Sequence, residues 1–294
     1  YIDRPRHVEF QIFGDRHGNV VHLFERECSI QRRFQKIVEE SPSPALDEAL
    51  REKMGAAAVA AAKKLNYEGA GTVEVILAPD SSFYFLEVNT RLQVEHPVTE
   101  MVAGQDLVRA QILVAAGEPL PFTQESLRQH GHAMECRIYA EDPARGFLPS
   151  TGRIVQFSTP KGAHVRVDAS VRRGSEVSVH YDPMLAKLVV WGTNREEARQ
   201  RMAWALRRFA VLGVTTNIEF LAAVCENETF VAGDLHTHFL EEQGLSLSPP
   251  DHLADPVAIA AGLVSRAPRE ATPSDRDDLE SAGPWRSAQR WRNV

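Results

Sequence analysis

Two strand-like runs joined by a short turn constrain the fold of this chain more than any other feature. Residues 71–77 and 83–89 are rich in β-branched and aromatic residues, and residues 78–82 between them are Ala-Pro-Asp-Ser-Ser, a composition typical of a turn. A hairpin over these residues places Glu74 about opposite Glu87. Facing like charges destabilise a sheet, whereas Mg²⁺ is commonly held by one or two carboxylates. The pattern therefore predicts either a metal-binding hairpin or an exposed hairpin with two solvated glutamates.

Polar side chains continue past the second run at alternate positions. Glu87, Asn89, Arg91, Gln93 and Glu95 alternate with mostly apolar residues, and alternate residues of an extended chain share one face. Such a face combines carboxylates, amides and a guanidinium, and this mixture suits a cation together with an anionic substrate. We therefore expect the segment to line a binding site, with an amide oxygen of Asn89 close to the metal.

Three motifs resemble those of the biotin carboxylases of the ATP-grasp superfamily. The first is Glu87-Val-Asn-Thr-Arg-Leu-Gln-Val-Glu-His-Pro-Val-Thr-Glu100, the second is Cys28-Ser-Ile-Gln-Arg-Arg-Phe-Gln-Lys-Ile-Val-Glu-Glu40, and the third is Gly131-His-Ala-Met-Glu-Cys-Arg-Ile138. They occur in the family's order, which makes the resemblance more specific than any single glycine pattern. It covers residue 1 to about residue 243.

The resemblance implies an α+β fold with an antiparallel sheet and helices. We expect the C-terminal portion of an ATP-grasp domain over residues 1–125, followed by the mixed C-terminal domain of biotin carboxylases over residues 126–243. Residues 244–294 are rich in Ser, Pro and Asp, so we expect a linker and the start of a further, truncated domain.

Periodicity and turn residues predict the other elements. Strands are expected over residues 7–13, 20–24, 133–139, 152–157, 163–168 and 185–191. Helices are expected over residues 49–65, 104–116, 195–209 and 218–225, with Asp47, Asn194 and Asn217 as N-terminal caps.

The implied reaction is ATP-dependent carboxylation of biotin by bicarbonate through carboxyphosphate. The resemblance implies Mg²⁺ (or Mn²⁺), ATP and carrier-bound biotin as cofactors or substrates. The implied partners are bicarbonate, a carboxyltransferase subunit and a biotin-carrier domain, the parts of an acetyl- or propionyl-CoA carboxylase of fatty acid metabolism. The complete enzyme is expected to be an oligomer. Methylcrotonyl-CoA, pyruvate and urea carboxylases share this half and remain alternatives, as does a non-catalytic assembly remnant.

The resemblance also assigns a role to each candidate residue. Glu74, Glu87 and Asn89 are expected to hold the metal, and the two glutamates also serve as ATP ligands. Bicarbonate is expected to bind Lys36, Arg91, Gln93 and the backbone of Val94, because arginine offers a flat fork and lysine a point charge. The block from Arg91 to Glu95 together with Arg137 argues against a carbamoyl-phosphate enzyme.

Glu95, Arg91 and Arg137 are the expected catalytic residues. Glu95 would act as the base for bicarbonate, mostly through its placement, because nearby cations make a carboxylate a weak base. Arg137 would bind biotin and stabilise its enolate with preorganised positive charge. Solvated side chains, and for Arg137 a structural ion pair, are the alternatives on the residues alone.

Nucleotide contacts are expected from Ile2, His7 and Gln31 in the resemblance, although spacing alone favours a structural histidine at position 7. Phe34 stands where several family members have histidine, so a hydrogen bond to the nucleotide is lost there. His236 and His238 lack a third metal ligand nearby, and we interpret them as structural or surface residues.

Composition excludes several classes of function. The formal charge of −7 argues against a broad nucleic-acid surface, and no apolar run approaches the roughly 20 residues of a membrane span. Three scattered cysteines without a CxxC pair indicate buried reduced thiols. A cytoplasmic location is expected, or the mitochondrial matrix in a eukaryote.

A glycine-rich lid over the nucleotide is missing from the sequence, and the chain begins without methionine, at Tyr1. We therefore expect a fragment truncated at both ends, which carries half of the site and turns over ATP poorly by itself. Robust bicarbonate- and biotin-dependent ATP hydrolysis by the isolated chain would contradict this expectation.

Overall fold

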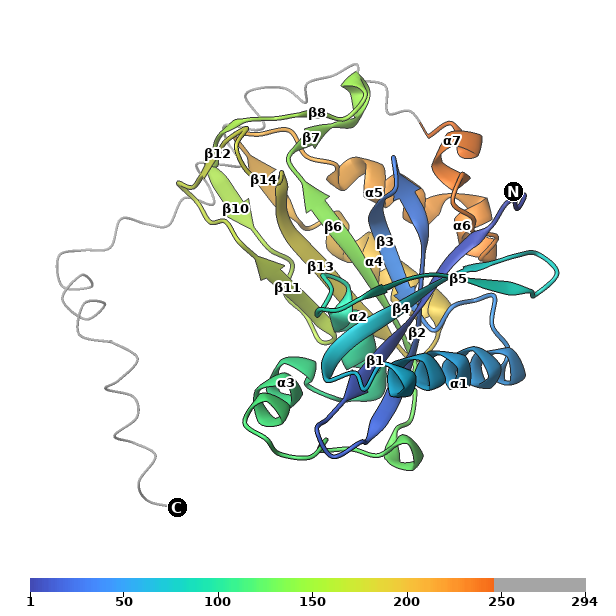
Figure 1. The fold of residues 1–294 in the computed structure, drawn as a ribbon. Coiled ribbons are helices and arrows are strands. Elements are labelled where there is room, and N and C mark those ends of the chain that lie inside the picture. The colour runs from blue at the N-terminus through green and yellow to red at the C-terminus, as the bar shows by residue number, and fades with distance from the viewer. Residues whose placement is uncertain (246–294) are drawn as a thin grey trace, which may run out of the picture. The chain divides into compact units, whose positions relative to one another are not determined.

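An eight-stranded antiparallel sheet forms the centre of the computed structural model, which describes residues 1–245. The strand order is β11-β13-β6-β3-β2-β1-β4-β5, with β11 and β5 at the two edges (Figure 1). These strands are β1 (Arg6–Gly14), β2 (Val20–Arg32), β3 (Gln35–Ser41), β4 (Gly69–Leu77), β5 (Phe83–Asn89), β6 (His132–Tyr139), β11 (Val165–Ala169) and β13 (Met184–Gly192). The expected α+β class with an antiparallel sheet is confirmed.

Short strands and helices complete the described residues. The strands are β7 (Glu141–Asp142), β8 (Leu148–Pro149), β9 (Gly152–Arg153), β10 (Gln156–Ser158), β12 (Glu176–Val177) and β14 (Ala210–Leu212). The helices are α1 (Glu48–Lys64), α2 (His96–Ala103), α3 (Leu107–Ala115), α4 (Arg195–Leu206), α5 (Ile218–Glu226), α6 (Glu228–Ala232) and α7 (Phe239–Gln243). Two single 3₁₀ turns cover Gln124–Ser126 and Pro143–Arg145.

Strand β1 separates an apolar face from a polar one. Val8, Phe10 and Ile12 of β1 pack with Met54 and Ala58 of α1, and α1 runs alongside β1 and β2 in Figure 1. Because side chains alternate along a strand, the residues between them in β1 face the other way. The other face of β1 therefore carries buried polar residues.

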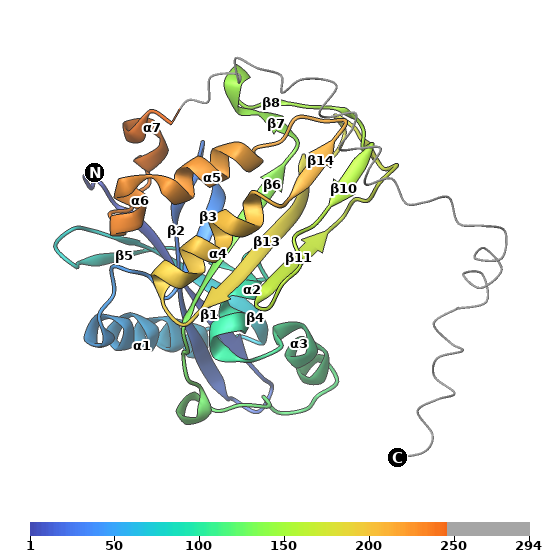
Figure 2. The ribbon, with the colours of Figure 1, turned by 180° about the vertical axis from the view of Figure 1, so that it is seen from behind.

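The same division holds in β6. Met134, Cys136 and Ile138 pack in one cluster with residues of α4 and α5, which lie over β6 and β13 in the rear view of Figure 2. Glu135 and Arg137 alternate with them and face the other side. The polar faces of β1 and β6 thus both lie on the side opposite to the helices that pack against these strands.

The predicted hairpin is confirmed. Strands β4 and β5 pair in antiparallel register, and Glu74 is the direct partner of Glu87. The connecting turn includes Ser81, which has a positive φ of 65°. The sequence pattern of two β-rich runs and a polar turn is therefore sufficient to bring the two carboxylates together.

The extended segment predicted up to Glu95 is wrong beyond Asn89. Strand β5 ends at Asn89, residues 90–95 form a loop, and α2 begins at His96 with Pro97 in its first turn. Proline has no N–H for a strand ladder and is well suited to the start of a helix. The alternation of polar residues therefore reflects a loop that folds back toward the sheet.

Other boundaries differ for local reasons. The helix expected over residues 104–116 starts at Leu107, because Gly104 ends α2 at a φ of 65° and Asp106 caps α3 through the N–H of Arg109. The helix expected to reach residue 209 ends at Leu206, and the strand expected over residues 152–157 is split into β9 and β10.

Asn217 also differs from the role predicted for it as a helix cap. Its side chain does not cap α5. Its Oδ1 accepts the N–H of Tyr139 at 2.8 Å, and its Nδ2 donates to the carbonyl of Arg137 at 2.9 Å. Two buried backbone groups at the end of β6 are satisfied in this way, so Asn217 supports the strand that carries Arg137.

The remaining predictions are mixed in outcome. Asp47 and Asn194 cap their helices as expected, by accepting the N–H groups of Leu50 and Glu197. All three cysteines are buried and unpaired. Within the described residues, no helix is long and apolar enough to cross a bilayer. The linker and further domain expected over residues 244–294 lie outside the described residues, except for residues 244 and 245.

Candidate functional site

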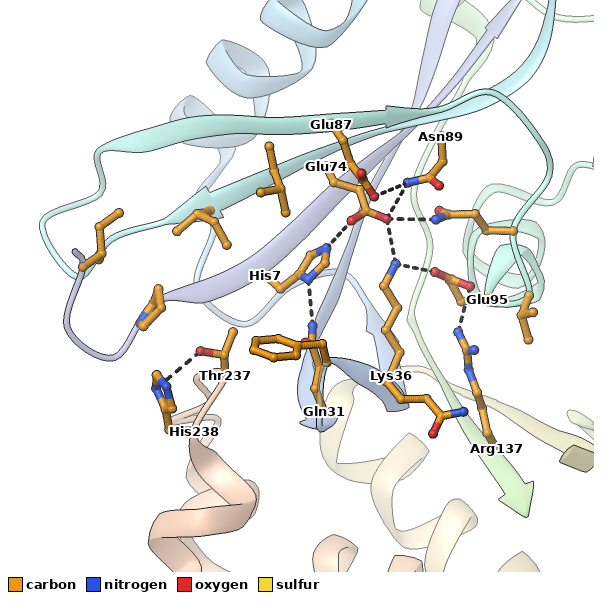
Figure 3. Close-up of a pocket in the computed structure, with 18 of the residues that line it drawn as sticks. His7, Gln31, Lys36, Glu74, Glu87, Asn89, Glu95, Arg137, Thr237 and His238 are labelled. Atoms are coloured by element: carbon orange, nitrogen blue, oxygen red, sulfur yellow. Dashed lines mark hydrogen bonds and ion pairs between the residues drawn. The ribbon is translucent and has the colours of Figure 1, made fainter. Parts of the chain in front are cut away.

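A cavity of about 880 Å³ opens between the polar face of β1, the β4–β5 hairpin and the loop that precedes α2. Figure 3 shows side chains from these elements and from β6 pointing into it. All of the candidate residues predicted from the sequence line this one cavity: Ile2, His7, Gln31, Lys36, Glu74, Glu87, Asn89, Arg91, Gln93, Val94, Glu95 and Arg137. The structure therefore brings together residues that are spread from position 2 to position 137 of the chain.

The acidic pair of the hairpin shares one amide donor. Nδ2 of Asn89 lies 3.0 Å from Oε1 of Glu74 and 3.1 Å from Oε1 of Glu87. The amide nitrogen of Asn89, not the oxygen expected as a metal ligand, therefore faces the carboxylates. Glu74 also accepts hydrogen bonds from Lys36 and Gln93, both at 2.9 Å.

Surrounding donors keep Glu74 ionised. Burial raises the pKa of its carboxyl, but hydrogen bonds and positive charge from His7 and Lys36 outweigh burial and hold the pKa well below its usual range. Two carboxylates on paired strands, bridged by an amide, form an oxygen-rich set of the kind that Mg²⁺ binds. The residues therefore fit a divalent cation held between β4 and β5.

Lys36 joins three carboxylates. Its Nζ lies 2.5 Å from Glu9, 2.9 Å from Glu74 and 2.7 Å from Glu95. A lysine ammonium has three N–H donors, and these contacts occupy all of them. Lys36 is thus in the cavity as predicted, but an incoming anion must compete with one of these carboxylates to contact it directly.

A fully buried arginine lies beneath Lys36. Arg26 is 0% exposed, and its Nε donates to Glu9 at 2.6 Å. Its Nη1 donates to Gln11 at 2.7 Å and to Thr99 at 2.9 Å. Its Nη2 donates to Thr72 and Gln93, both at 3.1 Å. The five donors of the guanidinium are therefore all used.

Glu9 is held between two cations. Burial raises the pKa of Glu9, yet Lys36 and Arg26 lower it to about 2. Glu9 positions Lys36 from below while Arg26 positions Gln93. Together they form a polar base on which the predicted residues rest.

Both carboxylate oxygens of Glu95 accept hydrogen bonds from cationic side chains. Its Oε1 accepts from Lys36, and its Oε2 accepts from Nη2 of Arg137 at 2.9 Å. Nε of Arg137 donates to Glu39 at 2.6 Å. Burial lowers the pKa of Arg137, but Glu39 and Glu95 raise it well above its usual value, so the guanidinium is permanently charged beside Glu95.

Arg91 differs from the other cations of the site. It is exposed on the loop before α2, and its side chain donates only to the carbonyl of Leu92, at 3.4 Å, within the described residues. A guanidinium without a carboxylate partner at a cavity edge can receive a planar oxyanion through two parallel hydrogen bonds.

The nucleotide candidates line the same cavity beside Glu74. Nδ1 of His7 lies 2.7 Å from Nε2 of Gln31, and Nε2 of His7 lies 2.8 Å from Glu74. Because Gln31 presents a donor, Nδ1 must accept and the ring proton belongs on Nε2, facing Glu74. Ile2 lines the cavity wall nearby.

Sequence reasoning missed several residues of the site. Glu9 and Arg26 are absent from the prediction, although charged residues within two apolar strands are a signal that could have found them. Phe34, left off the predicted set, lines the cavity with 96% exposure and a φ of 66°. His238 also lines the cavity, whereas His236 is buried.

Two family models match this chain. A model described as carbamoyl-phosphate synthase L chain, ATP binding domain, matches residues 1–123. A model described as biotin carboxylase C-terminal domain matches residues 135–242. The two matches leave residues 124–134 between them, and the second begins within β6. The strands that they contain pair within one sheet through β3 and β6.

Curated relatives cover nearly the whole chain. The alpha subunit of the mitochondrial methylcrotonoyl-CoA carboxylase of Dictyostelium discoideum is 51% identical over 293 residues, which are 99% of this chain and 42% of that protein. A pyruvate carboxylase subunit of Methanothermobacter thermautotrophicus is 53% identical over 242 residues, 82% of this chain and 49% of that protein. The chain thus spans less than half the length of these two relatives.

A solved structure has the same fold. It is the biotin carboxylase domain dimer of the 2-oxoglutarate carboxylase of Hydrogenobacter thermophilus, in complex with MgADP, ADP and bicarbonate. The TM-score is 0.83 at 46% sequence identity, and the match covers 85% of this chain and 55% of that chain.

Proposed function

The chain belongs to the biotin carboxylases, and from this premise we propose that its cavity supports ATP- and Mg²⁺-dependent carboxylation of carrier-bound biotin by bicarbonate. The main observation in support of the proposal is that two cations hold the carboxylate of Glu95. Lys36 and Arg137 hold its two oxygens at 2.7 and 2.9 Å, and Arg91 lines the same cavity. A fixed carboxylate between permanent cations suits deprotonation of a bound oxyanion.

The cation has a distinct place in this proposal. Glu74 and Glu87 hold Mg²⁺ (or Mn²⁺), and Asn89 turns its amide oxygen toward the ion. When bound, the ion neutralises charge on the nucleotide phosphates. Ile2, His7 and Gln31 contact the nucleotide on the side of Glu74 where His7 lies, 2.8 Å from that carboxylate.

Bicarbonate binds at the loop before α2. Arg91 forms the bidentate contact, Gln93 and the Val94 N–H complete the pocket, and Lys36 contributes its positive field. Glu95 accepts the bicarbonate proton, and its fixed geometry accounts for most of its effect on the rate. Arg137 then stabilises the developing negative charge on biotin, because a preorganised guanidinium needs no reorientation during the reaction.

The acyl substrate follows from the relatives and not from the cavity. Relatives from several organisms are named methylcrotonoyl-CoA carboxylase subunits, with 51% to 55% identity. We therefore propose methylcrotonyl-CoA as the substrate of the parent carboxylase, in place of the acetyl- or propionyl-CoA expected from the sequence. Pyruvate is the second candidate, because the pyruvate carboxylase subunit is 53% identical. A holoenzyme that contains this chain and carboxylates acetyl-CoA faster than methylcrotonyl-CoA would contradict the assignment.

The same proposal sets the partners and the parts of the protein. The carrier domain delivers biotin to the cavity, a carboxyltransferase subunit uses the product, and the enzyme works as an oligomer in the mitochondrial matrix or the cytoplasm. Residues 1–125 supply most of the nucleotide and bicarbonate contacts, and residues 126–243 supply Arg137.

A chimera tests the activity without depending on where this chain begins or ends. Residues 1–245 would replace the matching segment in the biotin carboxylase domain of the Hydrogenobacter enzyme. We expect bicarbonate- and biotin-dependent ATP hydrolysis, and we expect Glu95→Gln to lower kcat about 100-fold or more. A chimera that binds MgADP but never responds to bicarbonate would overturn the proposal.

The matched control for Glu95→Gln is Glu68→Gln. Glu68 is an exposed carboxylate that pairs with Arg16 on the surface, and the exchange should leave kcat unchanged. MgADP binding by the isolated chain separates the catalytic function from an assembly remnant. A non-catalytic remnant would fail to bind MgADP, and Glu87→Gln would then leave the measured binding of MgADP unchanged.

A further inference from the structure

Two side chains outside the predicted set hold the peptide groups on both sides of Val94. Nδ1 of His96 lies 2.7 Å from the carbonyl oxygen of Gln93. Nζ of Lys187 donates to the carbonyl oxygen of Val94 at 2.6 Å. Lys187 belongs to β13, far along the chain from the loop, so this contact joins the sheet to the loop before α2.

The two contacts determine where the Val94 N–H points. A trans peptide is planar, so the N–H of Val94 points opposite to the carbonyl of Gln93. That carbonyl is directed at the ring of His96, and the N–H is therefore directed away from it. Within residues 1–245 the Val94 N–H donates to no protein group, and Val94 lines the cavity.

The surroundings of His96 determine its tautomer. Burial lowers the pKa of His96, and so do Lys187 and Arg166, whereas the contact to Gln93 and the charge of Glu100 raise it, with a net lowering. A neutral ring has one N–H, and a carbonyl can only accept. The proton therefore belongs on Nδ1, where it holds the Gln93 carbonyl.

The surroundings of Lys187 hold it in place. Its side chain is 12% exposed, and its Nζ lies 3.6 Å from Asp168. Arg166 bonds Asp168 at 2.9 Å and Glu100 of α2 at 2.8 Å. The ammonium is thus supported by a charged network that ties β11 and β13 to α2, and Val94 is its shortest contact.

We propose that Lys187 and His96 are positioning residues that aim the Val94 N–H into the cavity as a fixed donor to a small oxyanion. The inference rests on the proposed function, in which that oxyanion is bicarbonate. Neither residue touches the substrate. Lys187 keeps the loop against β13, and His96 keeps the Gln93–Val94 peptide from rotating, so the donor requires no reorganisation when the anion arrives.

The expected effect is on anion affinity and not on nucleotide affinity. A hydrogen bond to a charged group that loses its alignment weakens binding by about tenfold or more. Replacing Lys187 with methionine keeps the length of the side chain and removes the donor. We expect Lys187→Met to weaken bicarbonate binding about tenfold and to change the affinity for Mn²⁺–ADP less than twofold.

Nuclear magnetic resonance on the isolated chain provides a direct readout. The protein is labelled with ¹⁵N-valine, the Val94 signal is assigned by its loss in Val94→Ile, and bicarbonate is titrated. In the wild type the Val94 amide signal should shift and saturate. In Lys187→Met it should start from a different position and hardly respond, whereas Lys161→Met, at an exposed lysine, should behave like the wild type.

Variants at His96 separate positioning from packing. In His96→Asn the amide nitrogen occupies about the place of Nδ1, so the donor to Gln93 is retained and the bicarbonate response should persist. His96→Leu retains bulk but leaves the Gln93 carbonyl only the longer contact from the backbone N–H of residue 96, at 3.3 Å, so the response should be weakened. If Lys187→Met fails to fold, this pair still decides the question, because equal responses of the His96→Asn and His96→Leu variants would overturn the inference.

The outcomes also separate this inference from the proposed function. The proposed function is contradicted if bicarbonate never moves the Val94 signal of the wild-type chain, or if it binds only at another site. A wild type that responds, together with a Lys187→Met variant that responds at the same concentrations, overturns the positioning role and leaves the proposed function standing.

Discussion

Replacing Arg26 with methionine should destabilise the protein strongly, because it removes one of the two cations that hold the buried carboxylate of Glu9. The guanidinium is fully buried and donates five hydrogen bonds, one of them to the equally buried Glu9. Removing one partner of a buried charge pair costs about 3–5 kcal/mol, and we expect a loss near the lower end of this range because Lys36 still contacts Glu9 at 2.5 Å. The threonine hydroxyls near Arg26 can rotate to other partners, so their loss adds little.

The double variant tests the origin of this cost. In Arg26→Met/Glu9→Gln the carboxylate that has lost Arg26 is replaced by a neutral amide. We expect the double variant to be less destabilised than the sum of the single variants by roughly 1–3 kcal/mol, which is the size of coupling between contacting residues. Lys36 still contacts position 9 in both backgrounds, which keeps the comparison matched.

Urea denaturation at pH 7, followed by far-ultraviolet circular dichroism, measures these differences. Arg16→Met is the control, because Arg16 forms an exposed pair with Glu68 at 3.1 Å and such pairs contribute at most about 1 kcal/mol. An Arg26→Met protein that loses less than about 1 kcal/mol, or single effects that add without coupling, would refute the argument that Arg26 and Glu9 form one buried unit.

Two further predictions concern β6 and its neighbours. Glu39 of β3 is the direct partner of Glu135 of β6. Burial and the charge of Glu95 raise the pKa of Glu39 to about 7, although Arg137 lowers it. Burial and the charge of Glu39 raise the pKa of Glu135. Both pKa values exceed those of the unfolded chain, so the stabilising contribution of each group is complete below about pH 4.5 and declines at higher pH, for Glu39 as the pH rises through about 7. Glu135→Gln should remove its share of this decline and make the fall in the free energy of unfolding shallower between pH 5 and 8. Curves parallel to the wild type would contradict this prediction. Asn217→Ala should lower the free energy of unfolding by about 2–3 kcal/mol in the same assay, since it leaves the buried N–H of Tyr139 and the carbonyl of Arg137 unpaired. A loss below about 0.5 kcal/mol, typical of surface exchanges, would show that water replaces the amide.

Local patterns in the sequence were sufficient for the hairpin and for the main helices. The two β-rich runs and the turn between them specify β4 and β5, and register follows from the turn, so the pairing of Glu74 with Glu87 could be predicted. The helix α1 has a capping aspartate and a long alanine-rich run. These features depend only on neighbours in the chain.

The loop after Asn89 could not be predicted by the same reasoning. Its polar residues have the spacing of a strand, but their side chains are drawn to partners supplied by other elements, such as Arg26 for Gln93 and Arg137 for Glu95. Long-range contacts of this kind override a local pattern. The resemblance to a family found the residues that the local pattern misread.

Buried charges were the other gap. Glu9 and Arg26 occupy strands whose alternation suggests one apolar and one solvated face, and nothing local shows that the second face is covered by α2 and its loop. His238 reaches the cavity from the far end of the described residues. A charged residue in a central strand is better interpreted as a candidate for a buried ion pair when opposite charges are present in the neighbouring strands.

We propose that one cavity holds a divalent cation at Glu74 and Glu87 and bicarbonate at the loop beside them. Relaxation of ¹³C-bicarbonate by Mn²⁺, measured with the isolated chain and ADP, tests both halves at once, because the paramagnetic effect requires the two ligands to lie close together. We expect strong relaxation that is lost in Glu87→Gln, where the ion is released, and in Arg91→Met, where the anion is released. Bicarbonate that binds but is not relaxed by bound Mn²⁺, or relaxation that survives both exchanges, would contradict this proposal.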